Sequence, residues 1–398
     1  MAKKLVLVLV LAILFVPGWA RAQPRAGECV IGPGLASTLL IPYFEVDLAN
    51  PTTGVTTLMS VNNGLSSATM VRVILWTDWG IPTVAFDVYL QGFDVQTISL
   101  RDVFNGIIPS TGEGVSLSGW DDCELPDYTP IHANPALTNT EIAKLRAHHL
   151  GTADPVNGLC HGEYYDDDVA RGYVTVDVVD ECYGVDLDQI SGTPAHWRFF
   201  EDGGVGSGVA IIDNRLWGDV FYVDPANAAA QGTEAIAIWA DATLFSGSDI
   251  YTFYGRYSGW SGDDDRVPLP RRWDQRFLNG GPFTGGTDFI VWRDTESAMV
   301  SGISCLSVPG WWPLHERTIS EIDEDANWTT IGNDTTIFYL ATQKVSTVGI
   351  GLINTFGWFQ IDTYQDQMWV QPVLSALGQY SLGLNGMPVE FLCGLTPP

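Results

Sequence analysis

The residues whose types and spacing best fit a known chemical role form a short acidic segment in the C-terminal part of the chain. Asp323, Asp325 and Asn327 place oxygen ligands at alternate positions, and Asp334 falls at the twelfth position of the same loop. The EF-hand pattern uses this spacing to bind calcium through carboxylate and amide oxygens. Trp328 stands where that pattern requires glycine, so we expect a calcium-binding turn of another kind at these four residues. The alternative is a solvated acidic turn without a metal.

Two further groups of residues are candidate metal ligands with weaker patterns. The runs Asp166–Asp168 and Asp263–Asp265 are acidic, but consecutive carboxylates cannot all converge on one ion without backbone strain. His148, His149 and His161 cluster around Cys160, which has the composition of a zinc or copper site. Adjacent histidines on a helix point in different directions, so solvated surface histidines are the alternative.

Tryptophan is unusually frequent, with 15 residues, and its flat face suits stacking on a sugar ring or another ligand. We expect Trp76, Trp239, Trp292 and Trp358 in the core, because they sit inside apolar runs. Four others have Gly or Pro neighbours in turn-rich segments and are therefore predicted to be exposed ligand-binding residues: Trp260, Trp273, Trp311 and Trp312.

Motifs of catalysis are missing from the sequence. It contains no G-x-S-x-G elbow, P-loop, H-E-x-x-H helix or G-x-G-x-x-G fingerprint, and we assign no catalytic residue. A triad assembled from distant residues would leave no such signature, because triads are defined by geometry rather than chain order.

The N-terminus has the pattern of a secretory signal peptide over residues 1–22. Lys3 and Lys4 precede an apolar run from Leu5 to Val16, and Ala20-Arg21-Ala22 supplies the small residues of a cleavage site. The run is shorter than the roughly 20 residues that span a bilayer. We therefore expect a protein free in the periplasm or outside the cell, without a membrane anchor.

The charge of the chain excludes some partners. Its 47 acidic residues against 19 Lys and Arg give a net charge of −28, whereas nucleic acids and anionic lipid surfaces require a basic footprint. A hydrophobic content of 46% indicates a globular protein with a core.

Six cysteines in an exported chain predict up to three disulfides, with fifteen possible pairings. We favour one bridge within the group Cys123, Cys160 and Cys182, and a second joining Cys305 to Cys393.

Short runs rich in Val, Ile, Thr and aromatic residues recur between turn residues along the whole chain, which is typical of an all-β protein. The predicted strands are Thr56–Val61, Met70–Trp76, Ala85–Leu90, Val95–Leu100, Tyr173–Val179, Asp219–Val223, Ala235–Trp239, Tyr251–Tyr257, Phe289–Trp292, Thr336–Leu340, Val348–Ile353, Trp358–Tyr364 and Met368–Val373. Both alternating sets of Met70–Trp76 are apolar apart from Arg72, which predicts a central strand covered on both faces. The turn Gln91–Asp94 predicts a hairpin with one face in water.

One helix is expected, over Thr138–Leu150, where Thr138 and Glu141 form a capping box and Gly151 follows the last turn. It lies in a polar stretch with little apolar periodicity. We therefore expect two packed β-sandwich units of immunoglobulin-like type over residues 28–118 and 172–395, separated by a disulfide-held insertion at 119–171 that carries the helix.

Several runs of this chain resemble those of a group of exported bacterial proteins of unknown function. They are Leu40–Asp47, Leu75–Trp79, Phe86–Leu90 with Val95–Leu100, Arg171–Asp177 and Tyr251–Tyr257. This resemblance implies export and a bacterial origin, and it implies no activity.

Together these patterns favour a secreted, non-enzymatic β-sandwich protein that acts by surface contact, as an adhesin, a matrix component or a ligand-binding module stabilised by calcium. Its expected partner is an extracellular glycan or protein. The alternative is a secreted carbohydrate-active hydrolase that uses paired carboxylates in a cleft lined by tryptophan.

Overall fold

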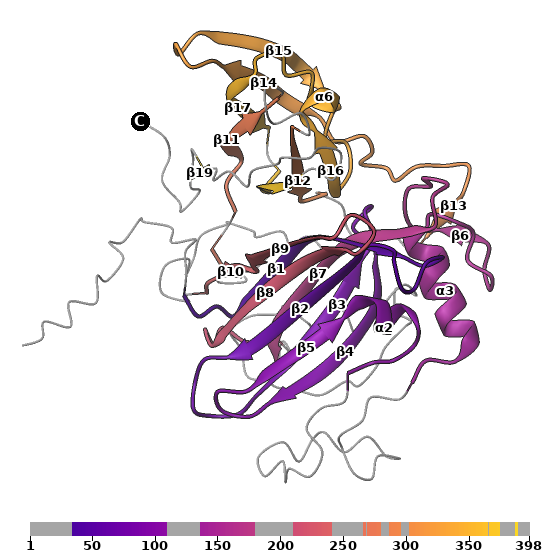
Figure 1. Ribbon diagram of the computed structural model, residues 1–398. Helices are drawn as coiled ribbons and strands as arrows, with labels where there is room; N and C mark the ends of the chain where they lie inside the picture. The colour runs from indigo at the N-terminus through magenta and orange to yellow at the C-terminus, as the bar shows by residue number, and fades with distance from the viewer. Residues whose placement is uncertain are drawn as a thin grey trace, which may run out of the picture.

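The computed structural model describes residues 34–109, 136–179, 210–240, 266–279, 286–295 and 302–374, except 268 and 365, and the backbone of 387–388. Several predictions fall on residues outside the described ones: the signal peptide at 1–22, the strand Tyr251–Tyr257, the exposed Trp260 and the acidic run Asp263–Asp265. The described chain is built from antiparallel sheets with few helices, which confirms the all-β class. Figure 1 shows an N-terminal group of strands below a C-terminal group.

The N-terminal unit consists of two facing sheets with strand orders β10-β1-β7-β3-β4 and β5-β2-β8-β9. Their strands are β1 (Thr38–Asp47), β2 (Thr56–Asn63), β3 (Thr69–Trp76), β4 (Pro82–Leu90), β5 (Val95–Ser99), β7 (Val169–Val179), β8 (Leu216–Asp224), β9 (Ala229–Glu234) and β10 (Ile236–Ile238). Alternate side chains of each strand enter the core between the sheets, as the two-residue period of a strand requires. Examples are Ile41, Val73, Val176 and, from the second sheet, Val61 and Val220.

The C-terminal unit repeats this arrangement with the sheets β16-β12-β18 and β15-β14-β17-β11-β19. The strands are β11 (Arg272–Leu278), β12 (Thr287–Arg293), β14 (Glu316–Ile322), β15 (Trp328–Thr335), β16 (Thr342–Ser346), β17 (Phe356–Thr363), β18 (Met368–Leu374) and β19 (Met387–Pro388). Phe289 and Val291 of β12 meet Ile319 and Phe359 in the core of this unit.

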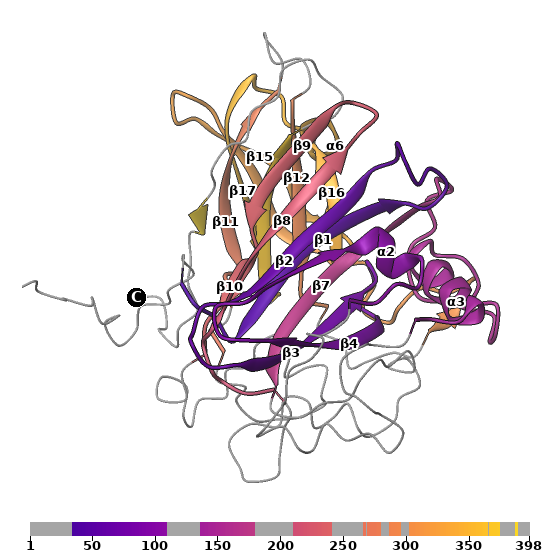
Figure 2. The same ribbon diagram turned by 60° about the horizontal axis from the view of Figure 1, so that its bottom comes forward.

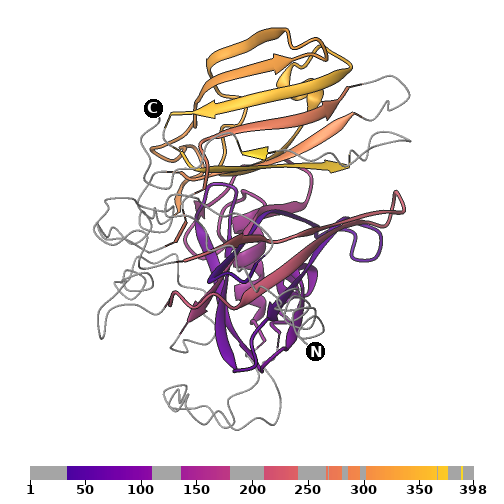
Figure 3. The ribbon, with the colours of Figure 1, turned by 90° about the vertical axis from the view of Figure 1, so that its left-hand side faces the viewer.

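The two units are joined by an apolar layer rather than by a loose linker. The tyrosine ring of Tyr173 on β7 stacks on Trp76 at 5.6 Å between centroids and meets Trp292 of β12 edge-on at 5.8 Å. The side chain of Lys344 on β16 donates to Glu45 on β1 at 2.6 Å. The sheets therefore stack one above another, as Figure 3 shows.

The helix predicted from the capping box is confirmed as α3 (Asn139–His149). The Thr138 side chain accepts from the backbone of Glu141, whose own side chain accepts from the backbone of Thr138. Gly151 follows with a φ of +66°, a conformation that favours glycine at a helix end. The other short helices are α2 (Leu100–Phe104) and α6 (Thr347–Ile350). Among the described residues, no helix has the length and apolarity to cross a membrane.

The central position of Met70–Trp76 is confirmed, because β3 is buried along its whole length and pairs with β4 and β7. The hairpin predicted at Gln91–Asp94 is wrong. β4 pairs with β3 in one sheet and β5 pairs with β2 in the other, so the turn crosses between the two layers. The polar side of β4 does not meet water, since Asp87 is buried in a 2.8 Å ion pair with Arg72.

Two other strand predictions are wrong. Thr336–Leu340 forms a turn, in which the carboxylate of Glu316 accepts from the backbone of Ile337 and Phe338. Val348–Ile353 contains most of α6, which Ser346 caps by accepting from the backbone of Gly349. In both segments a side-chain acceptor fixes the local backbone, and strand propensity alone does not register such contacts.

The expected division of the chain differs from the observed one. β7 inserts between β1 and β3, and β8 lies beside β2, so residues up to 238 complete the first unit rather than beginning the second. The immunoglobulin-like type of the two units is not confirmed.

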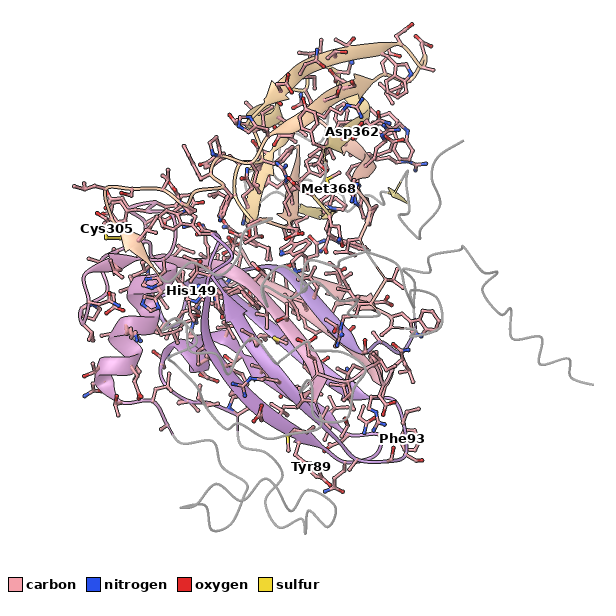
Figure 4. The ribbon with its side chains drawn as sticks, turned by 180° about the vertical axis from the view of Figure 1, so that it is seen from behind. Tyr89, Phe93, His149, Cys305, Asp362 and Met368 are labelled. Atoms are coloured by element: carbon pink, nitrogen blue, oxygen red, sulfur yellow. A yellow bond between two sulfur atoms is a disulfide. The ribbon has the colours of Figure 1, made fainter. Side chains whose placement is uncertain are left out.

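The favoured disulfide pairing is also corrected. Cys160 bonds to Cys305, which excludes a Cys305–Cys393 bridge and joins the loop after α3 to the C-terminal half of the chain. The bond is flanked by the two-residue pairing of β6 (Leu159–Cys160) with β13 (Ile303–Ser304). Figure 4 places Cys305 on the same side of the molecule as His149, with Tyr89 and Phe93 at the opposite end of the N-terminal unit. The remaining cysteines lie outside the described residues.

Candidate functional site

The outer face of the β5-β2-β8-β9 sheet carries exposed aromatic and aliphatic side chains. Trp217 is 46% exposed and Phe221 is 44% exposed, and both lie on β8. Val220 between them points into the core, so the alternation of the strand directs the two rings to the same side. Leu58 of β2 pairs with Phe221, and Val95 of β5 lies in the same row as Trp217. We call this surface the β8 platform, defined by Trp217, Phe221, Leu58 and Val95. Figure 2 shows β8 and β9 beside β2.

A polar row crosses the platform between its two aromatic rings. Register places Thr97, Ser60, Asp219 and Glu234 side by side on four adjacent strands. The hydroxyl of Ser60 lies 3.4 Å from the carboxylate of Asp219 and accepts from the Asp219 backbone at 3.2 Å. The side-chain amide of Asn62 also donates to Ser60, at 3.2 Å. These contacts fix the positions of the polar groups on the sheet.

The Phe221 ring rests on a glycine of the neighbouring strand. A Cβ at Gly232 would lie 2.8 Å from this ring, closer than real side-chain contacts allow. Glycine therefore permits the ring to lie across β9. Because β2 and β8 are held by pairing on both sides, the platform is a rigid surface rather than a loop.

A second cluster of interest is buried where the two units meet. Asp78 lies in the turn between β3 and β4, and its side chain is 3% exposed. Its carboxylate accepts from the backbone of Glu163 at 3.0 Å, and its carbonyl accepts from the backbone of Ala341 at 2.9 Å. Burial raises the pKa of Asp78 to about 7, while the Glu163 N–H and the charge of Arg171 oppose the rise. This carboxyl is therefore able to hold a proton near neutral pH.

Three buried histidines lie beside this turn. The ring of His148 is 3.8 Å from that of His161 between centroids, and its Nε2 is 2.8 Å from the carboxylate of Asp154. His149 contacts the hydroxyl of Thr83 through Nε2 at 2.7 Å and the carbonyl of Arg171 through Nδ1 at 2.8 Å. Burial lowers the pKa of His149 and His161 to about 4 and also lowers that of His148.

The histidines are thus neutral core groups rather than the solvated surface residues weighed from the sequence. Neutral His148 donates through Nε2 to the Asp154 carboxylate, since that contact requires a proton on the nitrogen. No group of three or more His, Cys, Asp or Glu side chains suited to a metal ion occurs in the part of the chain that the structure describes.

The tryptophans predicted to bind a ligand lie elsewhere than expected. Trp273 is 3% exposed, donates to the carbonyl of Met368 and meets Trp369 edge-on, so it belongs to the C-terminal core. Pro270 lies near Trp273 in the sequence, but β11 begins at Arg272 and its alternation turns Trp273 inward. Trp311 and Trp312 are half-buried against the apolar cluster that contains Cys160.

The four predicted calcium ligands are not brought together. Asp323 closes the β14–β15 turn by accepting from the backbone of Asp325 and Asn327 and from the Asn327 side chain. Asp334 lies near the other end of β15, about 23 Å along the strand from Asn327 at the usual rise per residue. Its carboxylate instead accepts from the hydroxyl of Tyr364. The prediction assumed that residues 323–334 form one loop that wraps an ion. The chain from Trp328 to Asp334 is instead an extended strand, which keeps Asp334 away from the other three residues.

Sequence reasoning missed Trp217, Phe221 and Asp78. A signal for the two aromatic residues was present in the sequence of residues 217–221, which alternates. Gly218 and Val220 are small or apolar and suit the core face of a strand, which places Trp217 and Phe221 on the opposite, outer face. No family model, curated protein or solved structure matches this chain.

Proposed function

We propose that this chain is an exported, non-catalytic binding protein that contacts a large ligand through the β8 platform. The observation that carries the proposal is the pair Trp217 and Phe221, both about half exposed on one face of one strand. Exposed aromatic side chains gathered on one face of a sheet are a feature of surfaces that meet a partner. A rigid sheet also loses little conformational entropy when it binds.

Export is proposed from the signal pattern at residues 1–22, and the Cys160–Cys305 bond supports it. Disulfides persist in oxidising compartments, such as the periplasm and the extracellular space. A role as adhesin, matrix component or ligand-binding module fits such a location, since each depends on contact and not on turnover.

Retention of the protein on immobilised polymers tests this function. The probes are cellulose, xylan, chitin, alginate and collagen, each incubated with wild type, W217A and F221A. Trp328 supplies the matched control, because it is an exposed tryptophan on β15 of the other unit, and W328A removes the same side chain far from the platform.

We expect one or more probes to retain wild type and W328A and to lose W217A and F221A. The variants should melt near the wild-type temperature, since truncating exposed side chains changes stability little. Equal retention of wild type and W217A on every probe that binds would show that the β8 platform is not the binding surface.

A secreted carbohydrate-active hydrolase is the second candidate, favoured by one observation. Burial raises the pKa of Asp78 to about 7, and the charge of Glu163 contributes to the rise, as a partner carboxylate does for a general acid. Its 3% exposure supports a structural role instead. Release of reducing sugar from soluble polysaccharides by wild type but not by D78N, with polymer retention unchanged, would establish the hydrolase.

A further inference from the structure

We infer that the ligand of the β8 platform is a neutral, linear polysaccharide chain that lies along β8. This inference rests on the proposed function and names its ligand class. The two rings are four residues apart on one strand, which corresponds to about 13 Å at the rise of an antiparallel strand. A ligand that touches both must therefore be extended and must present apolar faces at intervals.

The polar groups between the rings of Trp217 and Phe221 indicate which kind of extended ligand fits the platform. A pyranose ring has a flat face of C–H groups, which stacks on an aromatic ring, and an edge of hydroxyl groups, which need hydrogen-bond partners. Asp219 stands between Trp217 and Phe221 in the row described above, and the hydroxyl of the buried Ser60 holds its carboxylate in place. A carboxylate accepts from hydroxyl groups in charge-assisted hydrogen bonds, which are stronger than neutral ones. The platform thus alternates stacking, hydrogen-bonding and stacking surfaces along one line.

The charge of the platform favours a neutral polysaccharide over an anionic one. Register and alternation direct to the outer face the residues Val95, Thr97, Ser99, Thr56, Leu58, Ser60, Asn62, Trp217, Asp219, Phe221, Val223, Ala230, Gly232 and Glu234. Asp219 and Glu234 are acidic, and no Lys or Arg occurs in this set of described strand residues. Anionic polysaccharides and phospholipid headgroups would meet like charge there, at distances within the Debye length. A neutral chain avoids this repulsion.

The shape of the platform predicts a dependence on chain length. Leu58 lies beside Phe221, and Val95 lies in the row of Trp217, so each ring stands within a wider apolar strip. One sugar unit contacts a single strip, whereas a longer chain contacts both. The second contact is then intramolecular and raises affinity without any new kind of interaction.

Calorimetric titration with defined saccharides tests the inference. The ligands are cellohexaose, xylohexaose, mannohexaose, the corresponding monosaccharides and an alginate hexamer, each titrated into wild type, W217A, F221A, D219N and W328A. We expect at least one neutral hexasaccharide to bind wild type about tenfold or more tightly than its monosaccharide. W217A and F221A should each weaken that binding about tenfold or more, as central aromatic contacts do, and W328A should not change it.

The outcomes distinguish the inference from the proposed function. The inference is overturned if no neutral hexasaccharide binds, or if the alginate hexamer binds as tightly as the neutral chains. The proposed function still stands in that case if collagen or alginate retains wild type and loses W217A. Both fall if W217A matches wild type toward every saccharide and polymer that binds.

Discussion

Replacing Asp78 by asparagine should stabilise the protein at neutral and alkaline pH. Asparagine keeps an oxygen that accepts from the Glu163 backbone, and it removes a charge that burial makes unfavourable. A pKa that moves from 3.8 to about 7 corresponds to about 4 kcal/mol, at about 1.4 kcal/mol for each unit. D78N should therefore exceed wild type by up to about 4 kcal/mol in free energy of unfolding at pH 8.

The sign of the pH dependence follows from the raised pKa. The folded protein holds the Asp78 proton more tightly than the unfolded chain does, so the stability that this group contributes is complete below pH 3.8. In wild type this contribution to the free energy of unfolding disappears as pH rises through about 7. D78N has no group that titrates at this position, so its stability does not change for this reason. The difference between the two proteins should be near zero at pH 4, grow by up to about 1.4 kcal/mol for each pH unit, and level off above pH 7.

Urea unfolding of wild type and D78N at pH 4, 5, 6, 7 and 8 measures this difference, and the titration of the buried histidines cancels because both proteins carry them. D323N is the control. The pKa of Asp323 is lowered by the Asn327 side chain, so its variant should differ from wild type by a constant amount between pH 5 and 8. A difference between D78N and wild type that does not change with pH would refute the raised pKa of the buried Asp78 carboxyl.

Three further outcomes are expected. Replacing both Cys160 and Cys305 by serine should lower the free energy of unfolding by about 3–5 kcal/mol, because the bond closes a loop of 145 residues; denaturant titration checks this. The melting temperature should be the same in excess EDTA and in millimolar calcium, because Asp334 lies far from the Asp323 turn; a rise with calcium would restore the metal proposal. In D78N, stability should fall as pH drops from 6.5 toward 4, because the unfolded chain takes up protons on His149 and His161 in this range while the folded protein keeps both rings neutral. Urea midpoints that do not change across this range would contradict the burial of the two rings.

Local signals in the sequence predicted local structure well. The capping box at Thr138 and Glu141 fixed the start of α3, because both of its hydrogen bonds lie within four residues. The apolar run Met70–Trp76 predicted a central strand, since only a strand covered on both faces carries apolar residues in both alternating sets.

Pairing between distant segments was beyond the same reasoning. The turn at Gln91–Asp94 joins two strands that alternate, but alternation does not say which sheet each strand enters. The partner of Cys305 depends on the β6–β13 contact, which spans more than a hundred residues and leaves no local pattern. Trp273 and Trp217 are both tryptophans in strands, and only the packing of their sheets buries one and exposes the other.

Side-chain oxidation by hydroxyl radicals, read by mass spectrometry, tests the central claim most directly. The protein is oxidised alone and in the presence of the polymer that retains it, and the rate is measured at individual tryptophans. The account predicts that Trp217 reacts rapidly in the free protein and is protected on binding, while Trp328, at 59% exposure, reacts equally in both states. An unchanged rate at Trp217 together with protection at Trp328 or Trp311 would contradict it.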